Sequence, residues 1–173
     1  AGLVDDTDRL AERIRRQALE ETRRQTYQAM EALIANLNTM NSRAGAQTPF
    51  SSINYGTDTR PEARMVMRCL LEATEAGLGG GETAIFPIQI FRVQKGVNLN
   101  PGDPNYDLFR LACRVSAKRL FPNFSFQDAP FNAEFYRPGH PETEIAYMGC
   151  RTRVMSNVHD PSRAQTWGRG NLS

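Results

Sequence analysis

The sequence predicts an α/β fold, in which helices alternate with apolar strands and cover the faces of a sheet. Segments with apolar residues at helical spacing alternate along the chain with short β-prone segments,. One segment, 84–93, is apolar almost throughout, which is typical of a strand buried on both faces,. The 173 residues suffice for one domain with a hydrophobic core, and a content of 40% hydrophobic and 23% charged residues argues against a disordered chain,.

The first predicted element is a helix from about Asp5 to Asn41. Two sets of apolar residues recur at helical spacing, one from Leu10 to Leu19 and one from Tyr27 to Met40,. Between them, paired glutamates precede paired arginines by three and four residues, a pattern typical of a solvent-exposed helix face,. The polar interval allows a kink or a break near 22–26.

A strand and a second helix come next. Residues 41–56 have no helical period and contain a short predicted strand at 50–55,. The second helix opens with a capping box, in which Glu62 is the partner of Thr59, and a proline occupies its first turn,. Gly77 is a natural C-cap for this helix,. The residues expected to face the core are Met65, Val66, Cys69, Leu70 and Ala73.

The strand at 84–93 contains Pro87, which indicates a strand end or a bulge,. A third helix is predicted to begin at Asp103, before a proline, and to end before Pro122,. Another strand is predicted at 124–131. The residues expected to face the core from the third helix are Leu108, Leu111, Ala112, Val115 and Leu120.

The overall composition excludes several classes of protein. A formal net charge of +2 argues against strong, chain-wide attraction to nucleic acid or to an anionic membrane, and no apolar run approaches the roughly 18 residues of a membrane span,. The cysteines at 69, 113 and 150 form no CxxC pair, which disfavours a disulfide framework or a zinc site made by this chain alone and favours a reducing cytosol,. Cys69 and Cys113 fall within predicted helices, where packing is their expected role. Both ends of the sequence, at Ala1 and at Ser173, are expected to be interruptions of a longer protein.

Cys150 is the strongest candidate for chemistry. It directly follows a predicted strand at 145–149, where Gly149 lets the backbone turn or approach a ligand, and Arg151 and Arg153 come next,. A thiol at a strand end among cations is suited to reactivity or to an anionic substrate. The alternative is an inert cysteine that fills a small apolar space.

The glycine-rich segments and the two histidines carry weaker signals. Residues 77–81 follow a helix and precede a strand, the reverse of a phosphate-binding loop, which predicts a turn,. Residues 168–171 are flexible and cationic, which suits either a phosphorylated ligand or an ordinary turn. His140 and His159 have no partner at metal-ligand spacing, so both are expected on surface loops,.

Five stretches of the sequence carry a resemblance that covers most of residues 27–173. Together they are similar to the anaerobic (class III) ribonucleoside-triphosphate reductases, which are glycyl-radical enzymes. The stretches are Leu37–Asn54, Gly81–Phe91, Asn100–Phe109, Ala117–Asn123 and Tyr147–Arg153, the last continuing at Gly168–Ser173.

The resemblance implies a fold, a reaction and two catalytic residues. The fold is a ten-stranded α/β barrel with helices outside and a central finger loop. Cys150 matches the cysteine that becomes a thiyl radical and takes the ribose 3′ hydrogen, and Asn171 matches an asparagine of the substrate site. Ribonucleoside triphosphates are thereby converted to deoxyribonucleoside triphosphates, with formate as the reductant.

Substrate contacts are also expected from the resemblance. The loop that ends at Asn54 is expected to line the barrel mouth, because its hydroxyls and amides suit phosphate or ribose. The alternative is a buried loop whose polar groups satisfy its own backbone. The predicted substrate-binding residues are Ser51, Ser52, Asn54, Gly149 and Arg151.

Several parts of the implied enzyme have no counterpart in this sequence. They are the nucleotide-sensing region, a second barrel cysteine, the glycyl-radical site and a zinc-binding cysteine cluster. Residues 1–173 are therefore expected to be the central catalytic-barrel segment of a larger reductase, inactive by itself, with the glycyl radical and the zinc outside it. No residue of this chain is predicted to bind a cofactor or a metal.

The expected partners follow from the same resemblance. They are the substrate nucleotides, deoxynucleoside triphosphate and ATP effectors, a radical-SAM activating enzyme with an iron–sulfur cluster, and a second copy in a homodimer. Neither nucleic acid nor a membrane is expected, and the expected location is cytoplasmic. Two other functions stay open, namely a different glycyl-radical enzyme on the same barrel and a non-catalytic half of a split reductase.

Overall fold

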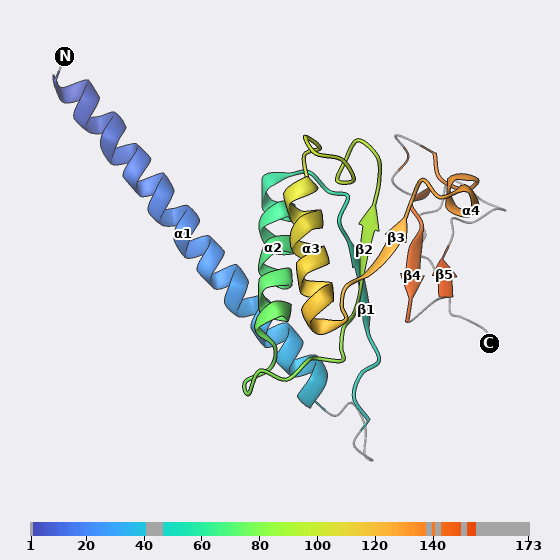
Figure 1. Ribbon diagram of the computed structural model, residues 1–173. Helices are drawn as coiled ribbons and strands as arrows, with labels where there is room; N and C mark the ends of the chain where they lie inside the picture. Colours follow the sequence, from blue (N-terminus) through green and yellow to red (C-terminus); the bar gives the residue numbers. More distant parts are fainter. Residues whose placement is uncertain (1, 41–46, 138–139, 141–142, 150–151, 155–173) are drawn as a thin grey trace.

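A computed structural model of the chain describes residues 2–40, 47–137, 140, 143–149 and 152–154. Helices and strands alternate along the chain up to a short fourth helix, and a hairpin of two strands follows (Figure 1). The elements are α1 (Gly2–Thr39), β1 (Ser52–Tyr55), α2 (Pro61–Ala76), β2 (Ile88–Val93), α3 (Tyr106–Arg119), β3 (Asn123–Phe126), α4 (Pro130–Ala133), β4 (Ala146–Met148) and β5 (Thr152–Val154).

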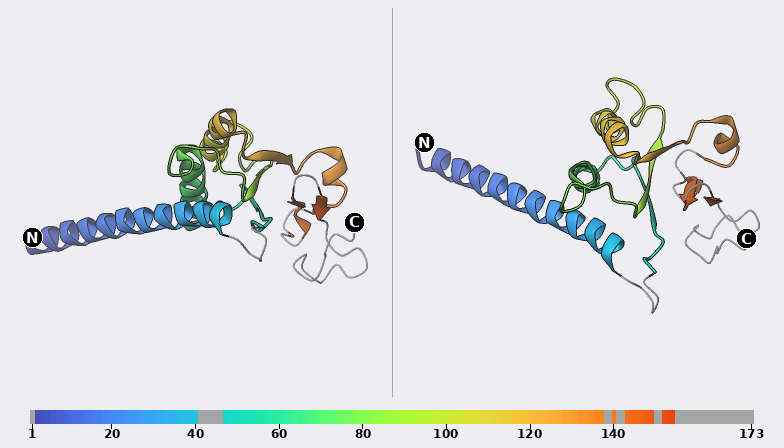
Figure 2. Two further views of the ribbon diagram at one scale, coloured as in Figure 1. Left: turned by 90° about the horizontal axis from the view of Figure 1, so that it is seen from below. Right: turned by 60° about the horizontal axis from the view of Figure 1, so that its bottom comes forward.

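Strands β1, β2 and β3 form a parallel sheet with β2 in the centre. Ser52 pairs with Ile88, and Ile90 pairs with Asn123. The connections between these strands are α2 and α3, as expected for parallel neighbours, which need a crossover. Both helices lie on one side of the sheet, and the hairpin of β4 and β5 lies on the other (Figure 2). The α/β class is thus confirmed, whereas the expected helical cover is present on only one face among the described residues.

The hydrophobic core fills the space between the sheet and the two helices. Alternate residues of β2 point into it, and Phe91 is fully buried with its ring against Tyr55, Phe109 and Phe124,. Buried polar side chains within this core are hydrogen-bonded to each other. The Tyr55 hydroxyl donates to Gln89 Oε1 at 2.7 Å, and burial raises the pKa of this tyrosine.

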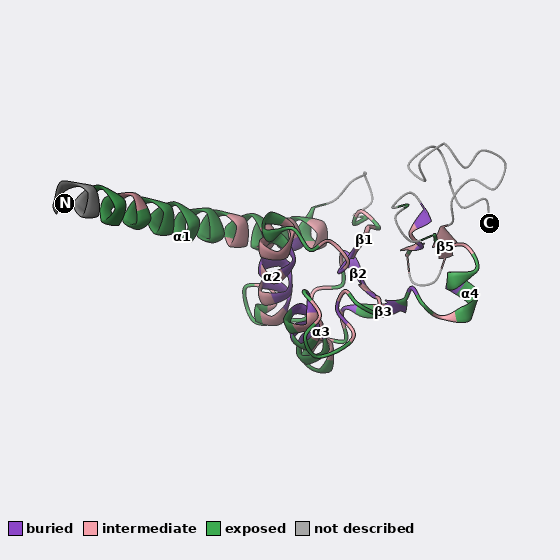
Figure 3. Ribbon diagram, turned by 90° about the horizontal axis from the view of Figure 1, so that it is seen from above, coloured by how far each residue is buried: buried purple, intermediate pink, exposed green. Residues whose placement is uncertain are grey.

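Helix α1 is continuous and projects away from the sheet (Figure 1). The predicted interruption near 22–26 is absent, because one helix runs through this interval, where the Thr22 and Thr26 hydroxyls donate to carbonyls four residues earlier, each at 2.7 Å, without ending the helix. Only the second apolar set packs against the domain, where Ile34 is buried (Figure 3). The first set is exposed, with Ile14 at 59% of its full surface.

The start of α2 differs from the prediction. Arg60 is the N-cap residue, no side chain caps the helix, and Pro61 is its first residue, so the capping box of Thr59 and Glu62 is absent. Asp58 instead accepts a hydrogen bond from the Arg60 amide at 3.0 Å, which fixes the turn before the helix. The buried residues are Met67, Cys69, Leu70, Leu71, Ala73 and Thr74, so the predicted core residue Val66 is wrong.

Two glycine and proline predictions are confirmed. Gly77 is the C-cap of α2 with φ of +85°, and a Cβ there would lie 2.6 Å from the Glu82 carbonyl oxygen. Pro87 directly precedes β2, so it marks a strand end. Helix α3 begins at Tyr106, later than predicted, and Leu120 is its C-cap at φ of +65°. Leu120 is therefore 80% exposed instead of facing the core.

The C-terminal strands are shorter than predicted. β3 ends at Phe126, because the chain turns into α4 at Pro130. β4 covers Ala146–Met148 and pairs in antiparallel orientation with β5, which the sequence did not predict. The described residues form a three-stranded and a two-stranded sheet, so the ten-stranded barrel stays a prediction.

Candidate functional site

The sheet face away from α2 and α3 carries polar side chains. Ile53 and Tyr55 of β1 pack into the core, so the alternate residues Ser52 and Asn54 point to the opposite face,. Arg92 of β2 lies on this second face as well, within reach of Glu144. A pocket of about 540 Å³ opens there, lined by Ile88, Ile90, Leu120, Phe121, Asn123, Phe124, Ser125 and Tyr147.

The hairpin of β4 and β5 lies over this polar face. Its last described pair before the turn is Met148 with Thr152, and Cys150 falls between these two residues in the sequence. The predicted catalytic residues Cys150 and Asn171, and the predicted substrate ligand Arg151, lie outside the described residues. The described part of the site consists of the groups that hold the hairpin.

Two residues of β1 hold the hairpin by its backbone. The Asn54 side-chain amide donates to the Tyr147 carbonyl at 2.8 Å, and its oxygen accepts from the Tyr147 amide at 2.9 Å. The Ser52 hydroxyl accepts from the Gly149 amide at 3.3 Å. The predicted loop residues Ser52 and Asn54 are thus brought directly beside the predicted strand 145–149.

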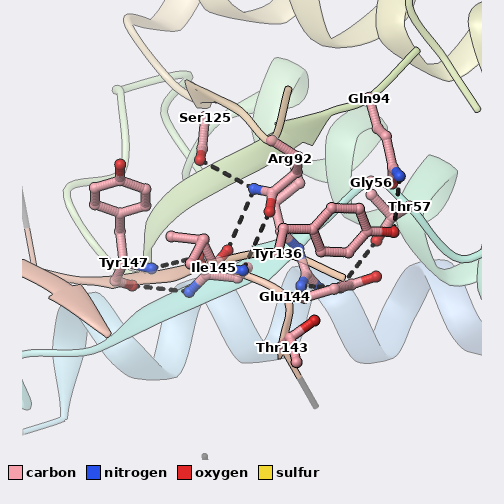
Figure 4. A network of polar contacts seen from close by, with 12 residues as sticks. Gly56, Thr57, Arg92, Gln94, Ser125, Tyr136, Thr143, Glu144, Ile145 and Tyr147 are labelled. Carbon is pink, nitrogen blue, oxygen red and sulfur yellow. Dashed lines mark hydrogen bonds and ion pairs between the residues drawn. The ribbon is translucent and has the colours of Figure 1, made fainter. Parts of the chain in front are cut away.

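A second side-chain amide holds the chain at Ile145, two residues before Tyr147 (Figure 4). Gln127, just after β3, is fully buried; its oxygen accepts from the Ile145 amide at 3.1 Å, and its Nε2 donates to the Ile145 carbonyl at 3.3 Å. The same Nε2 also donates to the Ser125 hydroxyl at 3.2 Å. This side chain therefore has partners at both of its polar ends, as burial requires.

An ion pair fixes the residue before Ile145. The Arg92 guanidinium donates to the Glu144 carboxylate, and the Thr57 hydroxyl donates to the same carboxylate at 3.3 Å (Figure 4). Both charged side chains are largely covered, at 18% and 21% exposure, so their attraction is screened less than that of a surface pair,. Arg92 Nε is buried without a hydrogen-bond partner among the described residues.

Ser51 and Gly149 complete the predicted contacts that the structure describes. The Ser51 hydroxyl is buried and has no partner within the described part of the chain. Gly149 has φ of +56°, and a Cβ at this position would lie 3.1 Å from Phe50 Cε1. The turn expected at Gly149 is therefore present, and glycine is favoured there both by the backbone angle and by the close approach to Phe50,.

Sequence reasoning missed three residues of this site, namely Gln127, Arg92 and Glu144. Gln127 did carry a signal, because it is an amide within the Phe-rich stretch 121–131, and a buried amide needs a partner,. Arg92 was hidden inside the apolar segment 84–93, which was predicted as a strand buried on both faces.

The other chemistry-bearing residues lie away from this face. Cys69 is buried in α2 as predicted, and burial raises the pKa of its thiol. Cys113 is exposed on α3, so the packing role predicted for it is wrong. His140 is exposed. The described residues contain no group of three or more His, Cys, Asp or Glu side chains arranged to hold a metal.

No helix in the described part of the chain combines the length and the apolar character that a membrane crossing requires.

Comparison with known proteins assigns the family. A family model described as anaerobic ribonucleoside-triphosphate reductase matches residues 4–173. The reductase of that name from Enterobacteria phage T4 is 37% identical over 156 residues, which cover 90% of this chain and 25% of the phage protein. The one from Escherichia coli K12 is 33% identical over 158 residues, covering 90% of this chain and 21% of its own length. The chain spans a quarter or less of the curated relatives it matches, and it belongs to the anaerobic ribonucleoside-triphosphate reductase family.

Proposed function

We propose that this chain is the central catalytic-barrel segment of an anaerobic ribonucleoside-triphosphate reductase, which converts ribonucleoside triphosphates to deoxyribonucleoside triphosphates. One observation carries the proposal beyond the family match. The hairpin whose sequence contains Cys150, with the two residues before it, is attached to the polar face of a parallel sheet by side chains from β1, from β2 and from the residue after β3. A reacting group needs this kind of rigid support, because hydrogen abstraction requires the two reacting atoms in contact.

In the proposed reaction, the Cys150 thiyl radical takes the ribose 3′ hydrogen. The C3′–H bond breaks, an S–H bond forms on Cys150, and the unpaired electron moves to C3′. The 2′ hydroxyl then leaves as water, and formate supplies two electrons and leaves as CO₂. Formate, a proton and the ribonucleotide thus give the deoxyribonucleotide, CO₂ and water, and Cys150 returns its hydrogen at the end of the cycle.

The proposed substrate contacts lie around the start of β1 and the end of β4. Ser51 is suited to this role because its hydroxyl is buried and has no partner among the described residues. Ser52 accepts from the Gly149 amide and keeps its own proton for a ligand. Arg151 supplies a cation for the triphosphate, and Asn171 supplies an amide for the substrate. Asn54 has its amide engaged by Tyr147, which favours a supporting role.

The cofactors and partners expected above are part of the same proposal. They are a glycyl radical and a zinc site outside this chain, a radical-SAM activating enzyme, nucleotide effectors and a homodimer, in the cytoplasm. The isolated chain is proposed to be inactive, because it contains no glycyl-radical site. The complete ten-stranded barrel is supported by a parallel βαβαβ order and by a sheet face that the described helices leave uncovered.

Replacement of Cys150 tests the proposal. Cys150→Ser in the complete reductase should abolish formate-dependent reduction of ribonucleoside triphosphates, because an O–H bond is too strong to serve as the radical carrier. Cys69→Ser is the matched control and should keep most of the activity, since Cys69 is buried in α2 away from the hairpin. Near-normal turnover by Cys150→Ser would overturn the assignment, and turnover of a carboxylic acid instead of a nucleotide would favour a different glycyl-radical enzyme.

A further inference from the structure

We propose that Asn54 and Gln127 are positioning residues that set the place of Cys150. One edge of β4 pairs with β5. Along the other edge, the two side-chain amides form the backbone hydrogen bonds that a neighbouring strand would otherwise form. The proposal rests on the proposed function of Cys150, and it adds two residues that reach the reacting thiol only through the backbone of the hairpin.

The bonding pattern of β4 shows this substitution. In a strand, the backbone N–H and C=O of one residue point to one edge, and those of its neighbours point to the other. Tyr147 and Ile145 therefore share an edge, and each gives its N–H and C=O to a side-chain amide. Ala146 and Met148 face the opposite edge, where they pair with Val154 and Thr152 of β5.

An amide is the side chain suited to this task. It offers one donor and one acceptor in a plane, as a peptide group does, so it satisfies both backbone groups of one residue. A carboxylate of the same shape accepts from an N–H but has no proton to give to a carbonyl. Asn54 and Gln127 therefore bind the backbone at β4 through both a donor and an acceptor, without adding a charge beside the reacting group.

The two amides come from opposite edges of the parallel sheet, one from β1 and the other from just after β3. Asn54 belongs to β1, which pairs with β2 through Asn54 and Ile90. The backbone amide of Gln127 donates to the Val93 carbonyl at the end of β2, at 2.8 Å. Attachment at two residues, Ile145 and Tyr147, fixes the direction of β4 as well as its position, and the Arg92 to Glu144 ion pair from β2 adds a third point.

The arrangement matters because Cys150 comes only three residues after Tyr147. A shift of β4 at Tyr147 passes along this short segment to the thiol. A displacement of about 1 Å in a reacting group costs about a hundredfold in rate, so small losses at Asn54 are amplified in catalysis.

The test uses Asn54→Asp and Asn54→Ala in the complete reductase. The aspartate keeps the shape and loses the donor to the Tyr147 carbonyl, and the alanine loses both bonds without adding a charge. The matched control is Asn38→Asp, because Asn38 also bridges backbone groups, accepting from the Ile85 and Phe86 amides and donating to the Phe86 carbonyl, but on α1. Glycyl-radical content, measured by electron paramagnetic resonance, identifies variants that were activated normally.

The first measurement is hydrogen exchange. Amides at 145–149 should exchange about tenfold faster or more in both Asn54 variants, because a backbone group loses its partner. The amide of Phe91 in the core should keep its wild-type protection in the same samples. Unchanged protection at 145–149 would overturn the attachment itself.

The second measurement is catalysis by variants with normal radical content. We expect kcat to fall about tenfold or more with little change in KM, and the isotope effect of 3′-deuterated substrate on kcat to rise, because abstraction becomes slower. Asn38→Asp should stay within about threefold of wild type. Faster exchange with unchanged kcat and isotope effect would overturn the positioning role and leave the proposed function standing. Failure of the proposed function is recognised separately, by activity of Cys150→Ser.

Discussion

Replacing Gly149 by alanine should loosen the hairpin beside the proposed radical cysteine. Gly149 has φ of +56°, a left-handed conformation that costs an L-residue about 1–2 kcal/mol,. The added Cβ would lie 3.1 Å from Phe50 Cε1, so the Phe50 ring must move. This ring stacks edge-to-face on Phe86 with centroids 5.1 Å apart, a contact worth about 0.5–1.5 kcal/mol,. Together the two effects give about 1.5–3.5 kcal/mol for local opening.

Hydrogen exchange of β4 and β5 in the complete reductase measures this loss. A change of that size accelerates exchange through local opening by about ten to several hundred times, while the core strand β2 keeps its protection. Gly96→Ala is the matched control for the backbone term, since Gly96 has φ of +76° and no atom near its added Cβ. In a Phe50→Ala background, Gly149→Ala should accelerate exchange only by the backbone term, because the added Cβ no longer meets the Phe50 ring. Unchanged exchange of the hairpin in Gly149→Ala would refute the reasoning.

Two further predictions concern the helices. The hydrogen bond from Arg114 lowers the pKa of Glu75, so this carboxylate stabilises the folded state above its ordinary pKa near 4.5, and the stabilisation is lost as the pH falls through that region,. Arg114→Gln should therefore flatten the fall of the thermal midpoint between about pH 5 and pH 3, and an unchanged slope would contradict it. Iodoacetamide should modify exposed Cys113 in the native protein and buried Cys69 only after unfolding, as peptide mass spectrometry can check; equal rates would contradict the burial pattern,.

Local sequence patterns were sufficient for most of the fold. The 3.6-residue period placed α2 and α3, and the apolar segment 84–93 contained the central strand β2 with its start set by Pro87. These elements are predictable because a helix or strand buries one periodic set of side chains. The errors lie at the ends and on the flanks of the helices. Val66 fits the apolar period but lies beyond the edge of the buried stripe, whose width the sequence does not give, and Leu120 fits the period but is the C-cap, where the helix has ended.

The candidate site was predictable in part. Five stretches of sequence, one of them around Cys150, together pointed to the reductase family, and comparison with known proteins shows that family. Ser52 and Asn54 were predicted beside the site from their residue types, and the structure brings both to the hairpin. The structure itself describes neither Cys150 nor Asn171, so their roles stay predictions.

The sequence by itself determined the order of the elements, the family and the cysteine proposed to react, because these depend on residues close together in the chain. Only the tertiary structure decided what holds the hairpin. Asn54 and Tyr147 are 93 residues apart, and Gln127 and Ile145 are 18 apart. An amide can bond almost any polar group within reach, so its residue type does not name its partner. Pairing of the three parallel strands and the position of the hairpin over their polar face bring each amide to one backbone segment, and that choice exists only once the chain is folded,.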